Sequence, residues 1–271
     1  MKGSMKKLGV IGGLGPMATA WFMEKVTELT DAKTDQEHIE MFIHSCPSIP
    51  DRTKFILGES KENPVPKIVE VGQNLVKNGA KVITIPCISS HAYMDEIKVA
   101  LEVPVVDGIE ETIHEIVHMC ANEKNIGNQG IKSTKNPSRR NEKTEKIRVG
   151  ILATDGTLRC GIFQSKLEKA GFEVVLPNEE NQKKVMHLIY KNVKANRPIE
   201  MNLFYDVVQE LNEKNVSVVI LGCTELSRVL QDRAFQNKMA AYETKRQGED
   251  EPKYVDVLEV IAKAAIRQCG V

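Results

Sequence analysis

Two cysteines occupy equivalent positions in two halves of the chain. Cys87 follows the apolar run 82–86, and Cys223 follows the apolar run 218–222. A thiol acts as a base or nucleophile once it is ionised, and backbone N–H groups at the start of a helix stabilise the thiolate. Two thiols in matching positions predict acid/base chemistry on one substrate, approached from two sides.

Polar residues close to the cysteines are candidates for ligand binding. Three hydroxyl residues follow the cysteines and can donate hydrogen bonds to a carboxylate: Ser89, Ser90 and Thr224. His91 lies four residues after Cys87, and Glu225 lies two residues after Cys223. Each can tune the nearby thiol or serve the local structure, and the structural role is favoured for Glu225.

The cysteines belong to a longer repeat of half the chain. Four segments recur in the same order, as the pairs 8–16 with 149–157, 42–44 with 174–176, 82–87 with 218–223, and 103–107 with 253–256. The apolar runs are short and helical patterns follow them, which is typical of βα units on a parallel sheet. Ligands bind beyond the carboxyl ends of such strands, so both cysteines are expected at that edge.

Composition excludes several classes of protein. The 271 residues suffice for about two domains, and 37 basic residues balance 37 acidic ones, so no net charge favours nucleic acid or an anionic membrane. The six cysteines form no CxxC pair, which argues against a disulfide framework or a zinc site and favours a reducing cytoplasm. Cys46, Cys120, Cys160 and Cys269 are interpreted as packing residues. No apolar run approaches the length of a membrane span.

Two polar segments interrupt the apolar pattern. Residues 121–146, which follow a predicted helix over 109–119, are rich in Asn, Lys and Ser, and 245–251 is similarly polar. Such segments bury too little apolar surface to pack, so we interpret them as exposed insertions, with a basic docking tail as the lesser alternative.

Taken together, the motifs resemble the cofactor-independent aspartate/glutamate racemases. The resemblance spans nearly the whole chain outside the polar segments, and rests on the motifs at 11–19, 50–53, 86–91, 152–157, 193–195 and 222–226. It implies two pseudosymmetric α/β domains, each a parallel sheet flanked by helices, with the active site in the cleft between them. The first domain is expected at 1–107 plus 240–271, with the C-terminal helix returning to it, and the second at 108–239. A homodimer is also implied.

The same resemblance implies an activity and further site residues. It implies racemisation of aspartate or glutamate without pyridoxal phosphate, metal or other cofactor, in which Cys87 and Cys223 exchange protons with the α-carbon. Arg52 and Lys194 are implied as cations for the substrate carboxylates. Further substrate contacts are implied for the turn Gly12–Gly13 and for Thr154, with Asp155 and Thr157 as weaker candidates.

The sequence leaves other functions open. Ile88 stands where the resembling proteins usually carry Asn, which would suit a less polar amino acid or a broad specificity. Residues 13–18 fit the G-x-G-x-x-A dinucleotide fingerprint, but the second strand ends in His44 and Ser45 rather than an acidic residue. The same pattern is compatible with a decarboxylase or isomerase of small dicarboxylates, and with a non-catalytic amino-acid-binding protein.

Overall fold

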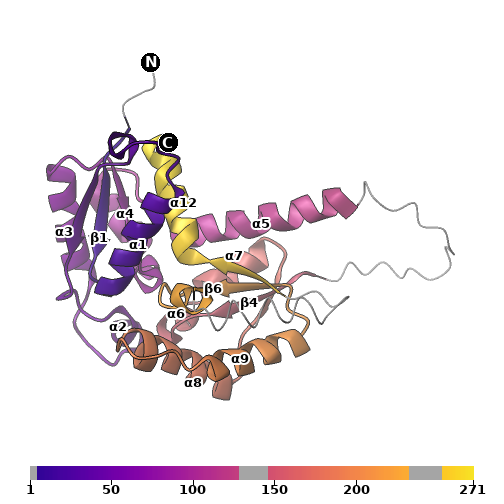
Figure 1. Ribbon diagram of the computed structural model, residues 1–271. Helices are drawn as coiled ribbons and strands as arrows, with labels where there is room; N and C mark the ends of the chain where they lie inside the picture. The colour runs from indigo at the N-terminus through magenta and orange to yellow at the C-terminus, as the bar shows by residue number, and fades with distance from the viewer. Residues whose placement is uncertain (1–4, 128–145, 232–251) are drawn as a thin grey trace.

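The computed structural model of the protein describes residues 5–127, 146–231 and 252–271, with the side chains of 122–127 excepted. Two sheets with only parallel pairings form its centre (Figure 1). The first has the order β2-β1-β3 and the second β5-β4-β6-β7. The strands are β1 Leu8–Gly12, β2 Met41–Ser45, β3 Val82–Thr84, β4 Arg148–Leu152, β5 Glu173–Val175, β6 Val218–Leu221 and β7 Lys253–Asp256. The predicted α/β fold with two parallel sheets is confirmed.

Helices follow most strands and cover the sheets. In the first half they are α1 Pro16–Leu29, η1 Asp35–Glu37, α2 Arg52–Leu57, α3 Val65–Lys77, η2 Ile88–Tyr93, α4 Met94–Leu101 and α5 Gly108–Gly127. In the second half they are α6 Asp155–Cys160, α7 Ile162–Lys169, α8 Glu179–His187, η3 Leu188–Val193, α9 Met201–Glu213, α10 Ser227–Leu230 and α12 Val257–Cys269. Residues in β1, β3 and β6 are buried throughout, as expected for parallel strands covered on both faces.

The fourth strand is developed differently in the two halves. In the second half, β7 pairs with β6 over four residues. In the first half, the predicted strand 103–107 makes only an isolated bridge between Val105 and Ile83. Pro104 contributes one reason, because it has no N–H to donate to a ladder. The sequence repeat is therefore kept in topology but shortened in this strand.

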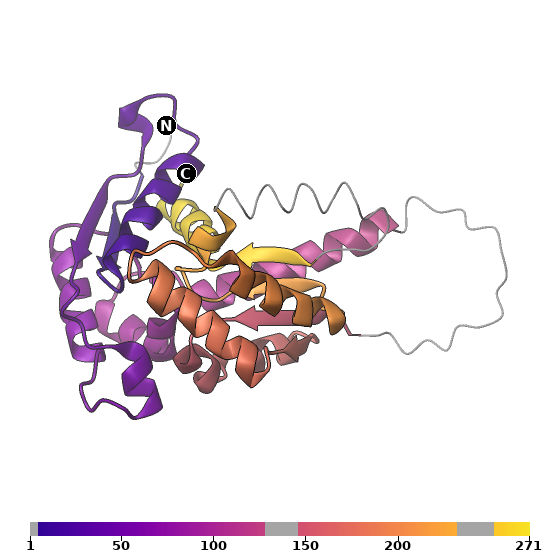
Figure 2. The same cartoon turned by 60° about the horizontal axis from the view of Figure 1, so that its bottom comes forward.

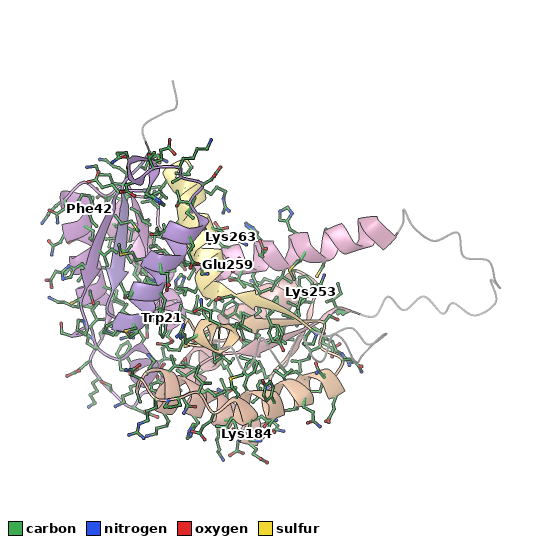
Figure 3. The ribbon with its side chains drawn as sticks, viewed as in Figure 1. Trp21, Phe42, Lys184, Lys253, Glu259 and Lys263 are labelled. Atoms are coloured by element: carbon green, nitrogen blue, oxygen red, sulfur yellow. The ribbon has the colours of Figure 1, made fainter. Side chains whose placement is uncertain are left out.

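The C-terminal helix lies where the two halves meet. α12 packs against α1 and α5, and Arg267 on α12 pairs with Glu111 on α5 at 2.5 Å. Figure 3 shows Glu259 and Lys263 beside each other on α12, where they form an ion pair of 2.7 Å. The hydrophobic core runs continuously from Val10 on β1 to Ile151 on β4.

The C-terminal segment, which was expected in the first domain, contacts both halves of the chain. Within 240–271, β7 joins the second sheet while α12 packs against α1, so the domain boundaries stay a prediction. The prediction that a polar insertion begins at 121 was wrong for its first residues, because α5 continues to Gly127 and extends away from the body (Figures 1 and 2). The remainder of that segment and all of 245–251 lie outside the described residues. Among the described helices, none combines the length and apolarity of a bilayer span.

Candidate active site

Cys87 lies three residues beyond the end of β3, at the carboxyl edge of the first sheet. Its side chain is buried, and it precedes the 3-10 segment η2 rather than an α-helix. The Cys87 N–H donates to the carbonyl of Ile85 at 2.7 Å, and the Cys87 carbonyl accepts from the N–H of Ser90 at 3.0 Å. These two bonds fix the backbone on both sides of the thiol.

Cys223 lies at the corresponding edge of the second sheet and has a carboxylate as its partner. Its Sγ donates to Oε2 of Glu225 at 2.7 Å, and the hydroxyl of Thr224 donates to the same oxygen at 3.4 Å. All three residues are buried. Burial and the charge of Glu225 raise the pKa of Cys223 well above its ordinary value, so this thiol holds its proton.

Lys194 links this carboxylate to both thiols. Its Nζ lies 3.1 Å from Oε1 of Glu225, and 28% of its side-chain surface stays exposed. Burial alone would lower the pKa of Lys194, but Glu225 and its other negative neighbours together outweigh it and raise that pKa. Cys223 and then Cys87 act on the ammonium in the same direction. Lys194 therefore lies within electrostatic reach of a thiol from each half of the chain.

Arg52 is the cation beside Cys87. It begins α2, and its guanidinium donates to the carbonyls of Pro50 at 2.9 Å and Leu14 at 3.1 Å. Burial disfavours the charged guanidinium, but the neighbouring Cys87 sulfur raises the pKa of Arg52 above its usual range.

The glycine turn after β1 brings the first half against Glu225. Gly13 has a φ of 89°, and a Cβ there would lie 2.4 Å from the backbone nitrogen of Cys46, so only glycine fits. A Cβ placed on Gly15 would lie 3.7 Å from Oε1 of Glu225. The Gly13 N–H donates to Oγ1 of Thr19 at 2.8 Å, which uses up a donor that we expected to face the substrate.

Gly12 is constrained by the same contact with α1. A Cβ on Gly12 would lie 2.4 Å from Cγ2 of Thr19. Packing against Thr19 therefore explains why position 12 is glycine.

Four hydroxyl groups meet between the two halves. Oγ1 of Thr53 donates to Oγ1 of Thr154 at 3.4 Å, and Oγ of Ser89 lies 3.3 Å from Thr154 and 3.1 Å from Thr157. Helices α2 and α6 approach closely here because Gly156 has no side chain, and a Cβ there would lie 2.9 Å from Cα of Thr53. Ser89 and Thr154, both expected at the site, are thus brought together, along with the weaker candidate Thr157.

Tyr190 is a residue that the sequence reasoning missed. It lies in the π-helical segment η3, and the ammonium of Lys194 is 5.3 Å from the centre of its ring. Burial raises the pKa of Tyr190, and its hydroxyl is hydrogen-bonded to Thr53 in the other half. The spacing of four residues between Tyr190 and Lys194 was the available signal, because such pairs share a helix face.

Three residues that were expected near the substrate, His91, Ser90 and Ile88, are buried close to Cys87 in the sequence. Both ring nitrogens of His91 are occupied, with Nε2 3.1 Å from the Ile85 carbonyl and Nδ1 accepting from the N–H of Gly108 at 3.2 Å. Oγ of Ser90 is buried without a hydrogen-bond partner in the described part of the chain. Ile88 is 3% exposed and packs in the hydrophobic core.

The groups that this site offers for chemistry are the two thiols and the charged side chains around them. The described residues contain no group of three or more His, Cys, Asp or Glu side chains arranged to hold a metal ion.

Comparisons with known proteins identify the family of the chain. The family model described as Asp/Glu/Hydantoin racemase matches residues 11–142 and 138–241. The broad specificity amino-acid racemase RacX of Bacillus subtilis is 28% identical over 229 residues, which are 82% of this chain and 87% of RacX.

Solved structures show the same fold. The aspartate racemase of Picrophilus torridus superposes with a TM-score of 0.72 at 26% identity, over 97% of this chain and 94% of that one. An aspartate racemase homologue from Pyrococcus horikoshii gives a TM-score of 0.66 at 22% identity, over 98% and 100%. The chain belongs to the Asp/Glu/hydantoin racemase family and is an isomerase of that family.

Proposed function

We propose that this protein interconverts the L and D forms of an acidic amino acid, aspartate or glutamate, by direct proton transfer at the α-carbon. The observation that carries the proposal is the placement of Lys194. Its Nζ lies 3.1 Å from the carboxylate that binds the Cys223 thiol, and its ammonium is within electrostatic reach of Cys87 in the other half of the chain. The likeness to the aspartate racemase of Picrophilus torridus, at 26% identity over nearly the whole chain, supports this substrate class.

The two thiols have different environments, which suits them to different roles in one turnover. Cys87, which lies beside the positive charge of Arg52, acts as the base that removes the α-proton from one face of the substrate. Cys223 next to Glu225 retains its proton and delivers it to the opposite face. After the transfer Cys87 carries the proton and Cys223 is the thiolate, which is the form that accepts the other enantiomer.

The cations and hydroxyl groups stabilise the substrate and the carbanion. The guanidinium of Arg52 and the ammonium of Lys194 balance the two carboxylates of an acidic amino acid. The hydroxyls of Ser89, Thr154 and Thr224 donate to the carboxylate next to the reacting carbon. Negative charge that develops there meets donors fixed by the fold, so little reorganisation is needed.

A broader substrate range is the second candidate, favoured by the likeness to RacX, which is named for broad specificity. One experiment separates the two. The purified protein is incubated without added cofactor with each common L-amino acid, and the products are resolved by chiral chromatography. Formation of D-aspartate or D-glutamate, lost in Cys87→Ala and in Cys223→Ala, supports the proposal. Inversion of neutral amino acids at comparable kcat/KM supports the broad range, and no inversion at all refutes both.

A further inference from the structure

The residue four positions beyond each cysteine holds the thiol loop at the start of a helix. In the first half this residue is His91, whose Nδ1 accepts from the N–H of Gly108 at 3.2 Å, next to Asp107. In the second half it is Ser227, whose hydroxyl donates to Oδ1 of Asp256 at 2.5 Å. The two aspartates end the matching segments 103–107 and 253–256 of the sequence repeat. Both loops are therefore held at equivalent points, although the side chains and their bonding partners differ.

Each of the two aspartates caps the helix that follows it. Asp107 accepts from the backbone N–H groups of Ile109 and Glu110 at 3.2 Å, at the start of α5. Asp256 accepts from the N–H of Leu258 at 2.9 Å, at the start of α12. Carboxylate caps of this kind fix the first turn of a helix.

In the first half the imidazole also replaces a bond of the sheet. Ile83 makes two bonds to the segment 103–107. Its N–H donates to the carbonyl of Pro104, and its carbonyl accepts from the N–H of Val106, both at 2.8 Å. The next rung of a parallel ladder would join the carbonyl of Ile85 to the N–H of Gly108. Instead the ring of His91 lies between those two groups and bonds to both. The same Ile85 carbonyl accepts from the N–H of Cys87, so the ring fixes the turn that carries the thiol.

The two capped helices are themselves packed together. α5 and α12 lie in contact and are joined by the ion pair of Glu111 with Arg267. Both thiol loops are thus anchored to one helix pair. Proton transfer from two sides of one carbon depends on the separation of the thiols, and a displacement of about 1 Å can cost about 100-fold in rate.

We propose that His91 and Ser227 are equivalent positioning residues, each of which anchors one thiol loop at the aspartate-capped start of a helix of the α5–α12 pair. His91 does so through the N–H of Gly108 and Ser227 through the carboxylate of Asp256. The inference rests on the proposed roles of Cys87 and Cys223. It adds that the distance between the thiols is set at the starts of α5 and α12, by groups that do not touch the substrate.

Two matched pairs of variants test the inference. His91→Gln keeps an N–H that reaches the Ile85 carbonyl, whereas His91→Asn is too short. Asp256→Asn keeps the acceptor oxygen for Ser227, whereas Ser227→Ala removes the donor. We expect the shortened and truncated variants to lose about tenfold or more in kcat with KM within about twofold. The two conservative variants should stay within about threefold of the native kcat.

Alkylation of the individual cysteines by iodoacetamide, followed by mass spectrometry of their peptides, gives a readout that does not depend on turnover. His91→Asn should change the alkylation rate of Cys87 and leave that of Cys223 unchanged. Ser227→Ala should change the alkylation rate of Cys223 and leave that of Cys87 unchanged. Thr30→Val is the control, since the Thr30 hydroxyl is buried and bonds to the Val26 carbonyl at 2.7 Å. It should change neither rate nor kcat.

Equal changes at both cysteines, or an unchanged pattern and native kcat in folded Ser227→Ala, would overturn the inference. If His91→Asn does not fold, Ser227→Ala decides, because it removes a single oxygen atom. The alkylation pattern also separates this inference from the proposed function. It can hold in a protein that racemises nothing, and it can fail in an active racemase.

Discussion

Replacing Glu225 by Gln should lower the pKa of Cys223 and shift the alkylation of its thiol to lower pH. In the native protein the carboxylate lies 2.7 Å from the sulfur, and burial and this charge together raise the pKa of Cys223. Two unit charges at this distance repel by about 6 kcal/mol at an effective dielectric constant of about 20. Lys194 offsets much of this, because its ammonium lies 3.1 Å from the other oxygen of Glu225.

We therefore expect a net fall in the pKa of Cys223, because the neutral amide of Gln does not repel the thiolate while the ammonium of Lys194 remains. The amide of Gln keeps the size and one acceptor, so the change isolates the charge. The assay is the pH dependence of alkylation at Cys223, resolved from the other cysteines by peptide mass spectrometry. A change in loop opening would scale the rate at all pH values, whereas the charge effect moves the midpoint.

Glu179→Gln is the matched control, because Glu179 is an exposed acid paired with Lys183 on α8. It should leave the midpoint of Cys223 in place. An unchanged or higher midpoint in Glu225→Gln would show that this carboxylate does not hold the proton on Cys223. The roles assigned to the two thiols would then lose their physical basis.

Other substitutions test the remaining parts of the site. Arg52→Lys should raise KM for the acidic amino acid about tenfold or more, because an ammonium cannot reproduce the planar fork that binds carboxylates; an unchanged KM would remove Arg52 from the substrate site. Gly156→Ala should destabilise the fold by about 1–3 kcal/mol in urea unfolding, because the new Cβ would lie 2.9 Å from Cα of Thr53, and native stability would show that the halves can separate there at no cost. Asp107→Asn should lower stability at neutral pH by about 1–3 kcal/mol. The ammonium of Lys98, 2.8 Å from Oδ2, and the N–H of Glu110 hold the pKa of Asp107 well below its usual value against the effect of burial. The ionised carboxylate therefore stabilises the fold above its ordinary pKa of about 3.9, and this contribution fades as pH falls toward the folded value. The difference between native protein and Asp107→Asn should shrink in acid, and a difference independent of pH would contradict this assignment.

The repeat of half the chain predicts much of the fold because its signal is local. Short apolar runs such as 8–12 and 218–221 form buried parallel strands, and a cysteine lies just beyond the carboxyl end of a strand in each half. The polar composition that predicts an insertion from 121 does not mark the end of α5, because helix ends are set by capping and packing as well as by composition.

Contacts between distant segments set the limit of prediction at the site. The position of Ile88 next to Cys87 predicts that it faces the substrate, but it packs into the core. The contact of Tyr190 with Thr53 joins η3 to α2, two segments far apart in the sequence, and no local pattern records it. The sequence favours a structural role for Glu225, whereas its direct contact with the Cys223 thiol places it beside the proton chemistry that we propose.

The central claim is that two thiols from opposite halves act on opposite faces of one carbon. Its most direct test is racemisation of L-aspartate or L-glutamate in deuterium oxide, stopped at low conversion, with the α-hydrogen of each enantiomer measured by mass spectrometry. If two thiols act, the D product carries deuterium from the second thiol, while the unreacted L substrate still carries its proton. A D product that retains the original proton would mean that a single group removes and returns it, and would contradict the account.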